Sequence, residues 1–415
     1  MKPSARRPKI ALVVPSLAEG GGVPSVARFV KDVVLRSSRF DLKLISLSTS
    51  SRDPANLNLG SPATWSRGAI ARTGEWEGLP YVHVGAECGE LEFQRYRPRN
   101  VLRDALVDCD LTQVVAGSPA WANAVTGLGK PVLLQVATRA RVERRMRDSV
   151  LRGPSDLWRK AMTEITDKLD DKALRTVDGI QVENPWMLEY AQNINSGRQV
   201  DLRYAPPGVD ATIFFPKTLR ETDKDPYILC VARLSDPRKN VGMLLEAYAS
   251  MPTDLIFKVR LVLAGSSGPS KQFWKRVDEL GLRERVSFIE KPQLSELVSI
   301  YQNASVFALP SDEEGLGVVL LEAMACAVPV VATRCGGPDG IITDGVDGFL
   351  VPLSDHKAMS ACLTKLLLDV GLNKEIGVNG FKNMSQRYEQ QVAGAQFVDM
   401  WENALSLKTR LTDAY

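Results

Sequence analysis

Short apolar runs of strand length alternate with helical patterns along the whole chain, and this alternation limits the fold more than any other feature. The runs are rich in valine, leucine and isoleucine, as is typical of strands buried on both faces of a parallel sheet. Strands that alternate with helices indicate βαβ units. The predicted strands are residues 10–14, 42–47, 81–84, 111–115, 132–136 and 179–182 in the first half, and 227–231, 259–264, 286–289, 306–308 and 328–332 in the second half.

A proline and glycine cluster separates the two sets of strands. Pro206, Pro207 and Gly208 follow the last strand of the first set, and residues 214–216 end in a further proline. Such a cluster breaks regular elements. A chain of 415 residues is also long enough for two domains that each bury a core. We therefore predict one domain in residues 1–206 and a second in residues 207–390.

The charge balance, the cysteines and the N-terminus argue against several classes of protein. The net charge is +3, from 52 Lys and Arg against 49 Asp and Glu, so we expect no nucleic-acid partner. The six cysteines form no C-x-x-C pair, which argues against a zinc site or a disulfide framework and favours a reducing cytoplasm. The apolar run after the basic N-terminus ends at Pro15, too short for a signal sequence or a membrane span. A cytoplasmic protein, soluble or at the inner face of the membrane, is expected.

Two carboxylates, Glu314 and Glu322, flank a glycine-bounded turn that opens a predicted helix. Glu314 lies in the turn, where its side chain can reach a sugar hydroxyl. Glu322 lies further into the helix, whose first amide N–H groups, from Leu316 to Val318, can receive an anion. One element can thus hold a sugar, a ribose and a phosphate. The alternative is that both glutamates are solvated helix residues favoured by the helix dipole.

A glycine-rich loop, Gly20 to Gly22, follows the first predicted strand and precedes a helical pattern from Val26. Glycine lets backbone N–H groups approach an anion closely. A dinucleotide-binding motif would need a third glycine near Ser25 and an acidic residue at the end of the second strand, where Ser48 stands instead. The loop therefore argues against an NAD enzyme. A turn that binds no ligand is the alternative.

Several short motifs follow one another in the second half of the chain. They are residues 232–234, 239–240, 263–265, 314–322, 328–332, 336–338 and 347–352. With these motifs in this order, the chain resembles the retaining glycosyltransferases of the GT-B fold, family 4, also called glycosyl transferases group 1. The resemblance implies an α/β fold with two Rossmann-like domains whose parallel sheets face a central cleft. It also implies that the first domain binds the acceptor, the second binds the nucleotide sugar, and a helix in residues 391–415 crosses back to the first domain.

The resemblance assigns roles to individual residues. Arg233 and Lys239 would bind the donor diphosphate, Glu314 the transferred sugar, and Glu322 the ribose hydroxyls. Arg233, Lys239 and Glu314 are the predicted catalytic residues. The predicted donor-binding residues are Gly20, Gly21, Gly22, Lys291, Leu316, Gly317, Val318 and Glu322, with backbone groups around Lys291 selecting the base.

Chemistry supports the roles of the two cations. Arg233 closes a strand at the carboxyl edge where open α/β sheets bind ligands. Two cations aimed at one diphosphate stabilise the charge that develops on the leaving group, and loss of one such contact commonly costs about 3 kcal/mol of barrier. Arg238 could bind the diphosphate in place of Lys239. Alternatively, these basic residues form a solvated loop that binds no ligand.

The predicted activity is the transfer of a sugar from a UDP or GDP sugar to an acceptor with retention, in glycan or polysaccharide biosynthesis. The acceptor would be a glycan, a lipid-linked glycan or a small molecule. No cofactor and no metal are expected beyond the donor substrate. The enzyme alternative is a nucleotide-sugar epimerase or phosphorylase on the same fold. The alternative that is not an enzyme is a noncatalytic protein that binds a sugar nucleotide and acts as the partner of another transferase.

The chain departs from the family pattern at the histidine that often follows the strand at 132–136 and contacts the donor sugar. Thr138 and Arg139 stand there instead, and they are predicted sugar or acceptor contacts together with Asn184. Either these residues replace the histidine, or the sugar subsite differs, or transfer activity is lost. His83, on a strand pattern, is expected to be structural. A further departure is Ala327, which would carry about 1 kcal/mol of strain in a left-handed helix cap.

Two other charged segments have weaker functional readings. Asp108 and Asp110 resemble a metal-binding Asp-x-Asp, but they precede a strand, whereas carboxylates that hold a metal diphosphate should follow one. A basic segment runs from Arg139 to Lys160. It is either a solvated helix face or a surface that attracts anionic lipid headgroups, in peripheral contact with a membrane, or an acceptor diphosphate, worth about 1 kcal/mol per Lys or Arg near a charged surface.

Overall fold

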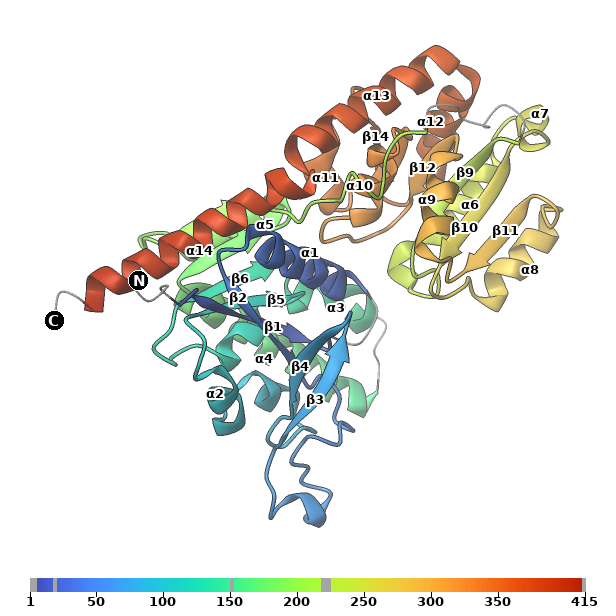
Figure 1. Cartoon of the computed structure of the whole chain (residues 1–415). Coiled ribbons are helices and arrows are strands. Elements are labelled where there is room, and N and C mark those ends of the chain that lie inside the picture. The colour runs from blue at the N-terminus through green and yellow to red at the C-terminus, as the bar shows by residue number, and fades with distance from the viewer. Residues whose placement is uncertain (1–5, 18–20, 150–152, 218–224, 413–415) are drawn as a thin grey trace. The chain divides into compact units, whose positions relative to one another are not determined.

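The computed structural model describes residues 6–17, 21–149, 153–217 and 225–412, and these divide into two compact units (Figure 1). Unit 1 comprises Met1–Pro207 and Ala393–Tyr415, and unit 2 comprises Gly208–Val392. The chain therefore passes between the units twice, once on leaving unit 1 and once on returning to it. Each unit is built around its own sheet.

The sheet of unit 1 has the strand order β3-β4-β2-β1-β5-β6-β7-β8. Its pairs are parallel except for the pair of β3 with β4 at one edge. The strands are β1 (Lys9–Pro15), β2 (Asp41–Leu47), β3 (Ala71–Trp76), β4 (Leu79–Val84), β5 (Leu111–Ala116), β6 (Val132–Val136), β7 (Gly179–Val182) and β8 (Asp201–Tyr204). The central strands are buried along nearly their whole length, which explains their continuous apolar sequences.

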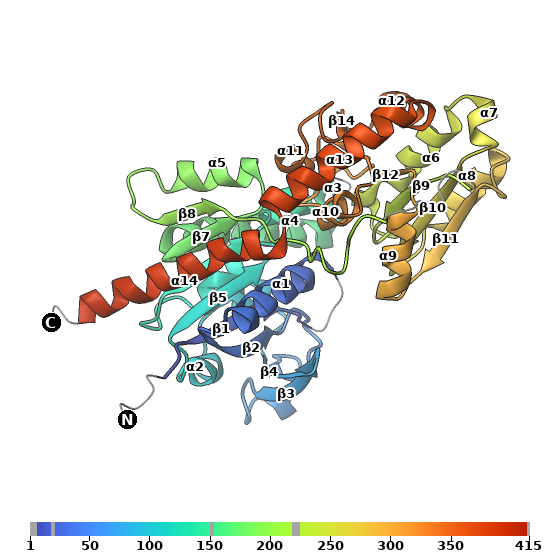
Figure 2. The same cartoon turned by 45° about the horizontal axis from the view of Figure 1, so that its top comes forward.

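Helices cover both faces of this sheet. One face packs against α1 (Gly22–Ser37) and α14 (Gln390–Thr412), which lie on the same side in Figure 2. There Trp401 Nε1 donates a hydrogen bond to Gln113 Oε1 of β5 at 2.8 Å, so α14 completes the core of unit 1. The other face packs against α2 (Asn100–Leu106), η3 (Pro119–Ala124), α4 (Pro154–Thr176) and α5 (Pro185–Ile194). The remaining helices of unit 1 are η1 (Pro62–Thr64), η2 (Glu92–Tyr96) and α3 (Ala140–Ser149).

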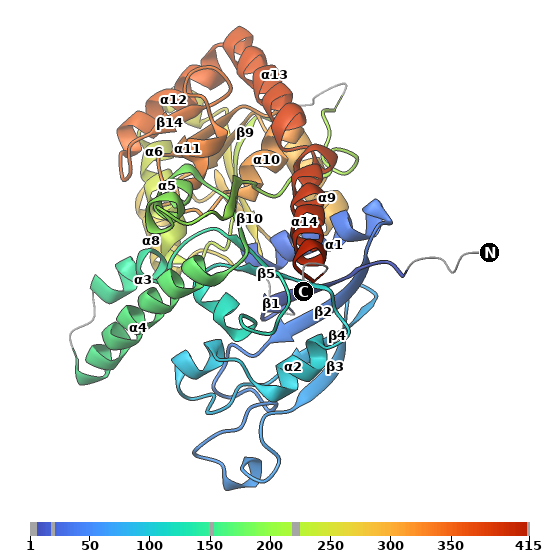
Figure 3. The same cartoon turned by 90° about the vertical axis from the view of Figure 1, so that its left-hand side faces the viewer.

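The sheet of unit 2 is parallel throughout, with the order β11-β10-β9-β12-β13-β14. Its strands are β9 (Tyr227–Val231), β10 (Arg260–Gly265), β11 (Val286–Glu290), β12 (Val306–Leu309), β13 (Val330–Thr333) and β14 (Phe349–Val351). Its helices are η4 (Pro237–Lys239), α6 (Val241–Ala249), α7 (Thr253–Ile256), α8 (Lys271–Glu279), α9 (Leu294–Gln302), α10 (Val318–Ala325), α11 (Gly337–Ile341), α12 (His356–Leu368) and α13 (Val370–Arg387). The core on one face is closed by α6, α8 and α12, and that on the other face by α9, α10 and α13 (Figure 3).

Two Rossmann-like α/β domains with parallel sheets were predicted and are confirmed. Three strands were not predicted, namely β3, β8 and β14. Of these, β3 is an antiparallel edge strand that is mostly exposed, so it lacks the apolar run that marked the central strands. Among the described residues, no helix is both long and apolar enough to cross a membrane.

Candidate functional site

Loops at the carboxyl edge of the unit 2 sheet bring two of the three predicted catalytic residues together. Lys239 ends η4, in the loop after β9, and Glu314 lies in the loop after β12. Lys239 Nζ donates a hydrogen bond to Glu314 Oε1 at 2.7 Å, and Ser311 Oγ donates to the same oxygen at 2.7 Å. Arg233 follows β9 on the same edge, is exposed, and lies 3.5 Å from the carboxylate of Asp236. The site therefore contains a cation and a carboxylate in direct contact, with a second cation in the same loop.

The loop after β9 is shaped by its own side chains. Asp236 caps η4 by accepting a hydrogen bond from the Arg238 N–H at 3.1 Å. Asn240 adopts a left-handed conformation (φ 42°), which asparagine tolerates better than most residues, and it caps α6. Asn240 Nδ2 also donates to Asp312 Oδ1 at 2.9 Å, while the Asp312 N–H donates to the Arg238 carbonyl at 2.8 Å. These bonds join the two loops that carry Lys239 and Glu314.

The backbone of Glu314 is fixed by a third loop. Its N–H donates to the Cys335 carbonyl at 3.2 Å, and its carbonyl accepts from the Gly337 N–H at 3.0 Å. Only glycine fits at position 337, because the third loop also lies against the backbone of Leu316. A Cβ at Gly337 would lie 2.3 Å from the Leu316 carbonyl oxygen. Gly317 then takes a left-handed conformation (φ 88°) at the start of α10. The glycines of the motif thus set the backbone that presents Glu314.

Arg238 and Lys239 point to different partners. The Arg238 guanidinium pairs with Asp236 at 2.9 Å and lies 4.0 Å from Glu313, whereas Lys239 binds Glu314. The structure thus groups Lys239 rather than Arg238 with the predicted sugar-binding carboxylate. The binding of the donor diphosphate by Lys239 stays a prediction.

Glu322 in α10 has a buried partner that the sequence did not reveal. The Tyr301 hydroxyl, from α9, donates to Glu322 Oε2 at 2.7 Å, and the side chain of Tyr301 is fully buried. Burial and the neighbouring Glu322 carboxylate hold the pKa of Tyr301 well above its usual range. The phenol therefore stays protonated and fixes the orientation of Glu322.

Replacing Glu322 with alanine is expected to raise the KM for the donor about tenfold and to leave kcat nearly unchanged. Ribose hydroxyls gain no charge in the transition state, so a residue that binds them, as is predicted for Glu322, contributes to uniform binding. A hydrogen bond to a charged group is worth about 1.5–3 kcal/mol. Tyr301→Phe is the matched variant and should raise KM less, since it loosens Glu322 without removing it. Steady-state kinetics over a donor series measures both, and an unchanged KM for Glu322→Ala would remove this residue from the site.

The other predicted donor-binding residues lie at two sheet edges. Lys291 follows β11 with a left-handed backbone (φ 46°), and its N–H donates to the Gly265 carbonyl at 2.8 Å while its side chain is exposed. Gly21 and Gly22 stand at the start of α1 in unit 1. Gly20 lies outside the described residues. Leu316, Gly317 and Val318 form the entry to α10, as predicted from the motif.

The segment that replaces the expected histidine is held tightly inside unit 1. Arg139 pairs with Asp167 and Asp171, each at 2.8 Å, and its guanidinium lies 3.8 Å from the centre of the Tyr190 ring. This guanidinium is thus engaged in internal contacts. Contact between Arg139 and a sugar stays a prediction that would require these pairs to rearrange.

Thr138 and Asn184, the other two predicted contacts, are buried close to this segment. The Thr138 N–H donates to the Gly117 carbonyl at 3.1 Å. Asn184 caps α5 by accepting from the Met187 N–H at 2.9 Å, and its Nδ2 donates to the Ala137 carbonyl at 2.6 Å. Asn184 therefore has a structural role as a helix cap that also fixes residue 137.

A buried carboxylate, Asp170 of α4, fixes the start of the same segment. Its Oδ1 accepts hydrogen bonds from Ser118 Oγ and from the Ala120 N–H at 2.8 Å, and its Oδ2 accepts from the Ala140 N–H at 2.8 Å. Asp170 is fully buried, and burial raises its pKa to about 7. One side chain thus links the loops that follow β5 and β6.

The basic segment and the Asp-x-Asp sequence both have internal partners. Arg141 pairs with Glu164 at 2.5 Å, and Arg144 pairs with Glu92. Membrane contact by this segment stays a prediction.

Asp108 of the Asp-x-Asp sequence accepts from Lys9 Nζ at 2.8 Å and from Lys43 Nζ at 2.7 Å, and these contacts hold the pKa of Asp108 well below its usual range. No group of three or more His, Cys, Asp or Glu side chains in the described ranges could hold a metal ion.

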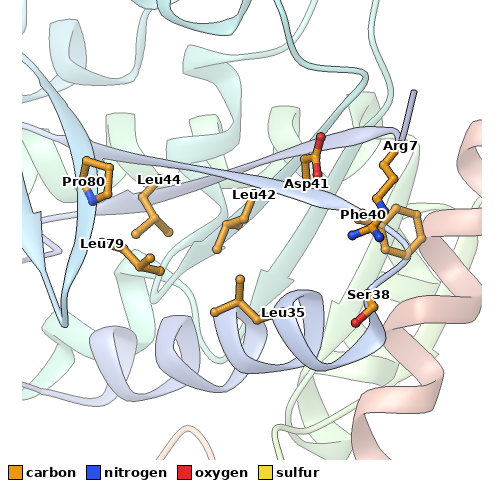
Figure 4. Close-up of a pocket in the computed structure, with 9 residues that line it drawn as sticks. All are labelled: Arg7, Leu35, Ser38, Phe40, Asp41, Leu42, Leu44, Leu79 and Pro80. Atoms are coloured by element: carbon orange, nitrogen blue, oxygen red, sulfur yellow. The ribbon is translucent and has the colours of Figure 1, made fainter. Parts of the chain in front are cut away.

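A pocket of about 260 Å³, lined by both apolar and polar side chains, lies at the amino edge of the unit 1 sheet (Figure 4). Leu42 and Leu79, from the first residues of β2 and β4, line it together with Leu35 of α1. Open α/β sheets bind substrates at the carboxyl ends of their strands, so this pocket lies at the wrong edge for catalysis.

Comparison with known proteins agrees with this arrangement. Residues 212–383 match the family model of the glycosyl transferases group 1. The chain is 32% identical over 220 residues to the GDP-mannose-dependent alpha-(1-6)-phosphatidylinositol monomannoside mannosyltransferase of Mycolicibacterium smegmatis, over 49% of this chain and 57% of that protein. It is 35% identical over 186 residues to the D-inositol 3-phosphate glycosyltransferase of Corynebacterium urealyticum, over 39% of this chain and 42% of that protein. The matched regions thus span about half the length of these relatives.

Two solved structures resemble nearly the whole chain. The sucrose-phosphate synthase of Thermosynechococcus elongatus superposes with a TM-score of 0.67 at 20% identity, covering 97% of this chain and 100% of that one. HepE of Anabaena, solved with UDP and glucose, superposes with a TM-score of 0.69 at 16% identity, covering 96% of this chain and 100% of that one. The chain therefore has the GT-B fold of two Rossmann-like domains, and its residues 212–383 are similar to the glycosyl transferases group 1.

Proposed function

We propose that this protein is a glycosyltransferase that moves a sugar from a nucleoside diphosphate sugar to an acceptor with retention at the anomeric carbon. The observation that carries the proposal is the contact between Lys239 and Glu314, because it joins a cation for phosphate to a carboxylate for sugar hydroxyls. A bound donor has its diphosphate directly next to its sugar. The pair therefore matches the junction at which the glycosidic bond breaks.

Each of these residues has a distinct role in the proposed reaction. Arg233 and Lys239 stabilise the negative charge that grows on the diphosphate as it leaves. Glu314 holds the transferred sugar, and Glu322 binds the ribose. The acceptor attacks from the face on which the diphosphate departs, and the leaving phosphate takes the acceptor proton. The two cations supply the positive charge that the leaving group requires, so we propose a reaction that does not depend on a metal.

The relatives suggest which substrates to try first. HepE was solved with UDP and glucose, and the mycobacterial relative is named for GDP-mannose. Both donors therefore belong in the first screen. The names of two relatives contain inositol phosphate or phosphatidylinositol monomannoside, so inositol phosphates are suitable first acceptors. Work in glycan or polysaccharide biosynthesis, in the cytoplasm or at the inner membrane face, is part of the same proposal.

Transfer assays with radiolabelled donor sugars test the function. Each donor is incubated with the full chain alone, with a mixture of acceptors, and with acceptors plus EDTA. A transferase labels the acceptor in the second and third incubations, and the linkage formed should keep the anomeric configuration of the donor. An epimerase would change the free donor without an acceptor, and a binding protein would leave every donor intact. Loss of transfer with EDTA that returns on adding metal would refute metal independence.

A further inference from the structure

The pocket of Figure 4 lies between α1 and the sheet of unit 1. Leu42 and Leu44 of β2 and Leu79 of β4 line it from the sheet, and Leu35 lines it from α1. Successive side chains of a strand point to opposite faces. Leu42 and Leu44 therefore point to the same face, and Figure 4 shows them turned toward Leu35. The inner part of the pocket is thus lined by aliphatic side chains.

These leucines are covered less and less from the inner end of the pocket to its opening. Leu44 is 2% exposed, Leu42 and Leu79 are partly buried, and Leu35 is 47% exposed. Apolar side chains that border a pocket gain free energy when an apolar group takes them out of water. The uncovered leucines therefore favour a ligand with an apolar part.

The pocket is long for its volume. Its lining follows the chain from Phe40 to Leu44, which is about 13 Å at the rise of a β-strand. A cavity of about 150 Å³ lined by aliphatic and aromatic side chains holds one benzene ring. On that scale, a pocket of about 260 Å³ holds roughly eight to ten carbon atoms. Because the pocket is narrow along this length, a single hydrocarbon chain fits it better than a ring system.

Contacts on both sides of the pocket hold α1 in place. One turn before Leu35, Lys31 Nζ donates to Glu77 Oε2 at 2.7 Å, in the turn between β3 and β4. Beyond the end of α1, the Phe40 ring packs edge-on against Trp401 of α14, with 5.6 Å between the ring centres. The pocket is therefore formed before a ligand arrives, which lowers the entropy that binding would cost.

The outer end of the pocket is polar. Arg7 and Ser38 line it there, and Figure 4 shows the Arg7 guanidinium beside the Phe40 ring. In the part of the chain that the structure describes, this guanidinium forms no hydrogen bond or ion pair. A planar guanidinium binds a carboxylate through two parallel hydrogen bonds, and a serine hydroxyl can donate a third. Asp41 also lines this end, but it alternates with Leu42 and so belongs to the opposite face of β2.

We propose that this pocket binds a linear aliphatic carboxylate of about eight to ten carbons. The carboxylate lies at Arg7 and Ser38, and the chain runs along β2 toward Leu44. The pocket lies at the amino edge of the sheet, away from the edge at which open α/β sheets bind substrates. The proposal therefore does not depend on the transferase function.

Calorimetry on the full chain with a series of linear carboxylates tests the proposal. Hexanoate, octanoate, decanoate and dodecanoate are titrated separately, below the concentrations at which they form micelles. From hexanoate to decanoate, affinity should rise about tenfold with each pair of added methylenes, because each buried methylene contributes a similar free energy. At dodecanoate the rise should stop, since the pocket is then full.

Variants at the two ends of the pocket separate the head group from the chain. Arg7→Gln should weaken octanoate binding about tenfold and leave 1-octanol binding unchanged, because the alcohol carries no charge. Arg103→Gln, at an exposed arginine of α2 outside the pocket, should change neither affinity. Leu35→Gln should weaken both ligands, whereas Leu368→Gln, at an exposed leucine of α12 in unit 2, should weaken neither.

Three results would overturn the proposal. If no carboxylate binds the unaltered protein, or if affinity does not depend on chain length, the ligand class is wrong. If Arg7→Gln and Leu35→Gln both bind octanoate as tightly as the unaltered protein does, the pocket is not its site. Tighter binding of octylamine than of octanoate would assign the head group to Asp41 and refute the carboxylate. Circular dichroism of each variant separates weaker binding from loss of the fold.

Discussion

Arg233→Ala and Lys239→Ala are each expected to lower kcat about a hundredfold or more, in addition to weakening donor binding. In the proposed reaction, the negative charge on the diphosphate grows as the glycosidic bond breaks, so each cation would bind the transition state more tightly than the ground state. The double variant should be nearly inactive. Arg233→Lys should also be impaired, because a point charge on a flexible stem does not replace a planar fork that holds two oxygens. Steady-state kinetics with the best donor measures each effect.

Arg238→Ala is the matched control for this loop, since the Arg238 guanidinium pairs with Asp236 rather than with Glu314. It should retain most of the activity. If Arg238→Ala abolishes transfer while Lys239→Ala has no effect, the diphosphate contact belongs to Arg238. If all three alanine variants are folded and turn over normally, the assignment of the diphosphate site fails. Thermal melting of each variant separates loss of activity from loss of fold.

Asp170→Ala is expected to lower the free energy of unfolding by about 3 kcal/mol or more. The change leaves three buried donors, from Ser118, Ala120 and Ala140, without their acceptor, and each unsatisfied buried group costs about 1–3 kcal/mol. Urea denaturation followed by tryptophan fluorescence measures the loss. Asp171→Ala is the neighbouring control on α4, where the carboxylate is partly exposed, and it should cost less.

The stability of the unaltered protein should also depend on pH through Asp170. Burial raises its pKa to about 7 in the folded state, against about 3.9 in an unfolded chain. The folded state therefore binds the proton more tightly, so this stabilisation is complete below about pH 4 and is lost as the pH rises through about 7. Between pH 5 and pH 8, the urea midpoint of the unaltered protein should fall relative to that of Asp170→Asn, which does not titrate. A difference that is constant over this range would contradict the assignment.

The sequence predicted the sheets well where strands are buried on both faces. The predicted strand at 227–231 coincides with β9, because Ile228 to Val231 are buried and apolar throughout. Ala327 indeed has a left-handed backbone (φ 55°), as its position after α10 required. The edge strand β3 was missed because its residues face solvent and carry no apolar run. The edge strand β14 was missed although Leu350 and Val351 are buried, because it has only three residues.

The candidate site in unit 2 was predictable to the extent that its residues follow strand ends in a motif. Lys239 and Glu314 were named from sequence, but their contact with each other depends on how the loops after β9 and β12 are joined by Asn240 and Asp312. Tyr301 could not have been found, since an apolar helix face gives no sign that one hydroxyl on it meets Glu322. Such partners come from tertiary packing rather than from local spacing.

A pocket of about 390 Å³ in unit 1, lined by Ser46 and His83, was hidden for the same reason. Its residues come from Ser16, the loop at 49–54 and two strands, and serine-rich loops are common on protein surfaces. His83 was expected to be structural; its ring lies between Ser46 and Asp53, and it lines this pocket. Long-range glycine packing, as at Gly85, leaves no local pattern either.

The position of α14 in the core of unit 1 has a consequence for how the protein is made. Domains usually fold as units, the N-terminal one first, while the chain leaves the ribosome. Here Phe397 and Trp401, which fill the face of the first sheet, are translated only after all of unit 2. Unit 2 can therefore finish folding before unit 1. Until then α1 covers only part of that face of the first sheet, and the apolar surface that α14 later buries stays exposed, which favours binding by chaperones during synthesis.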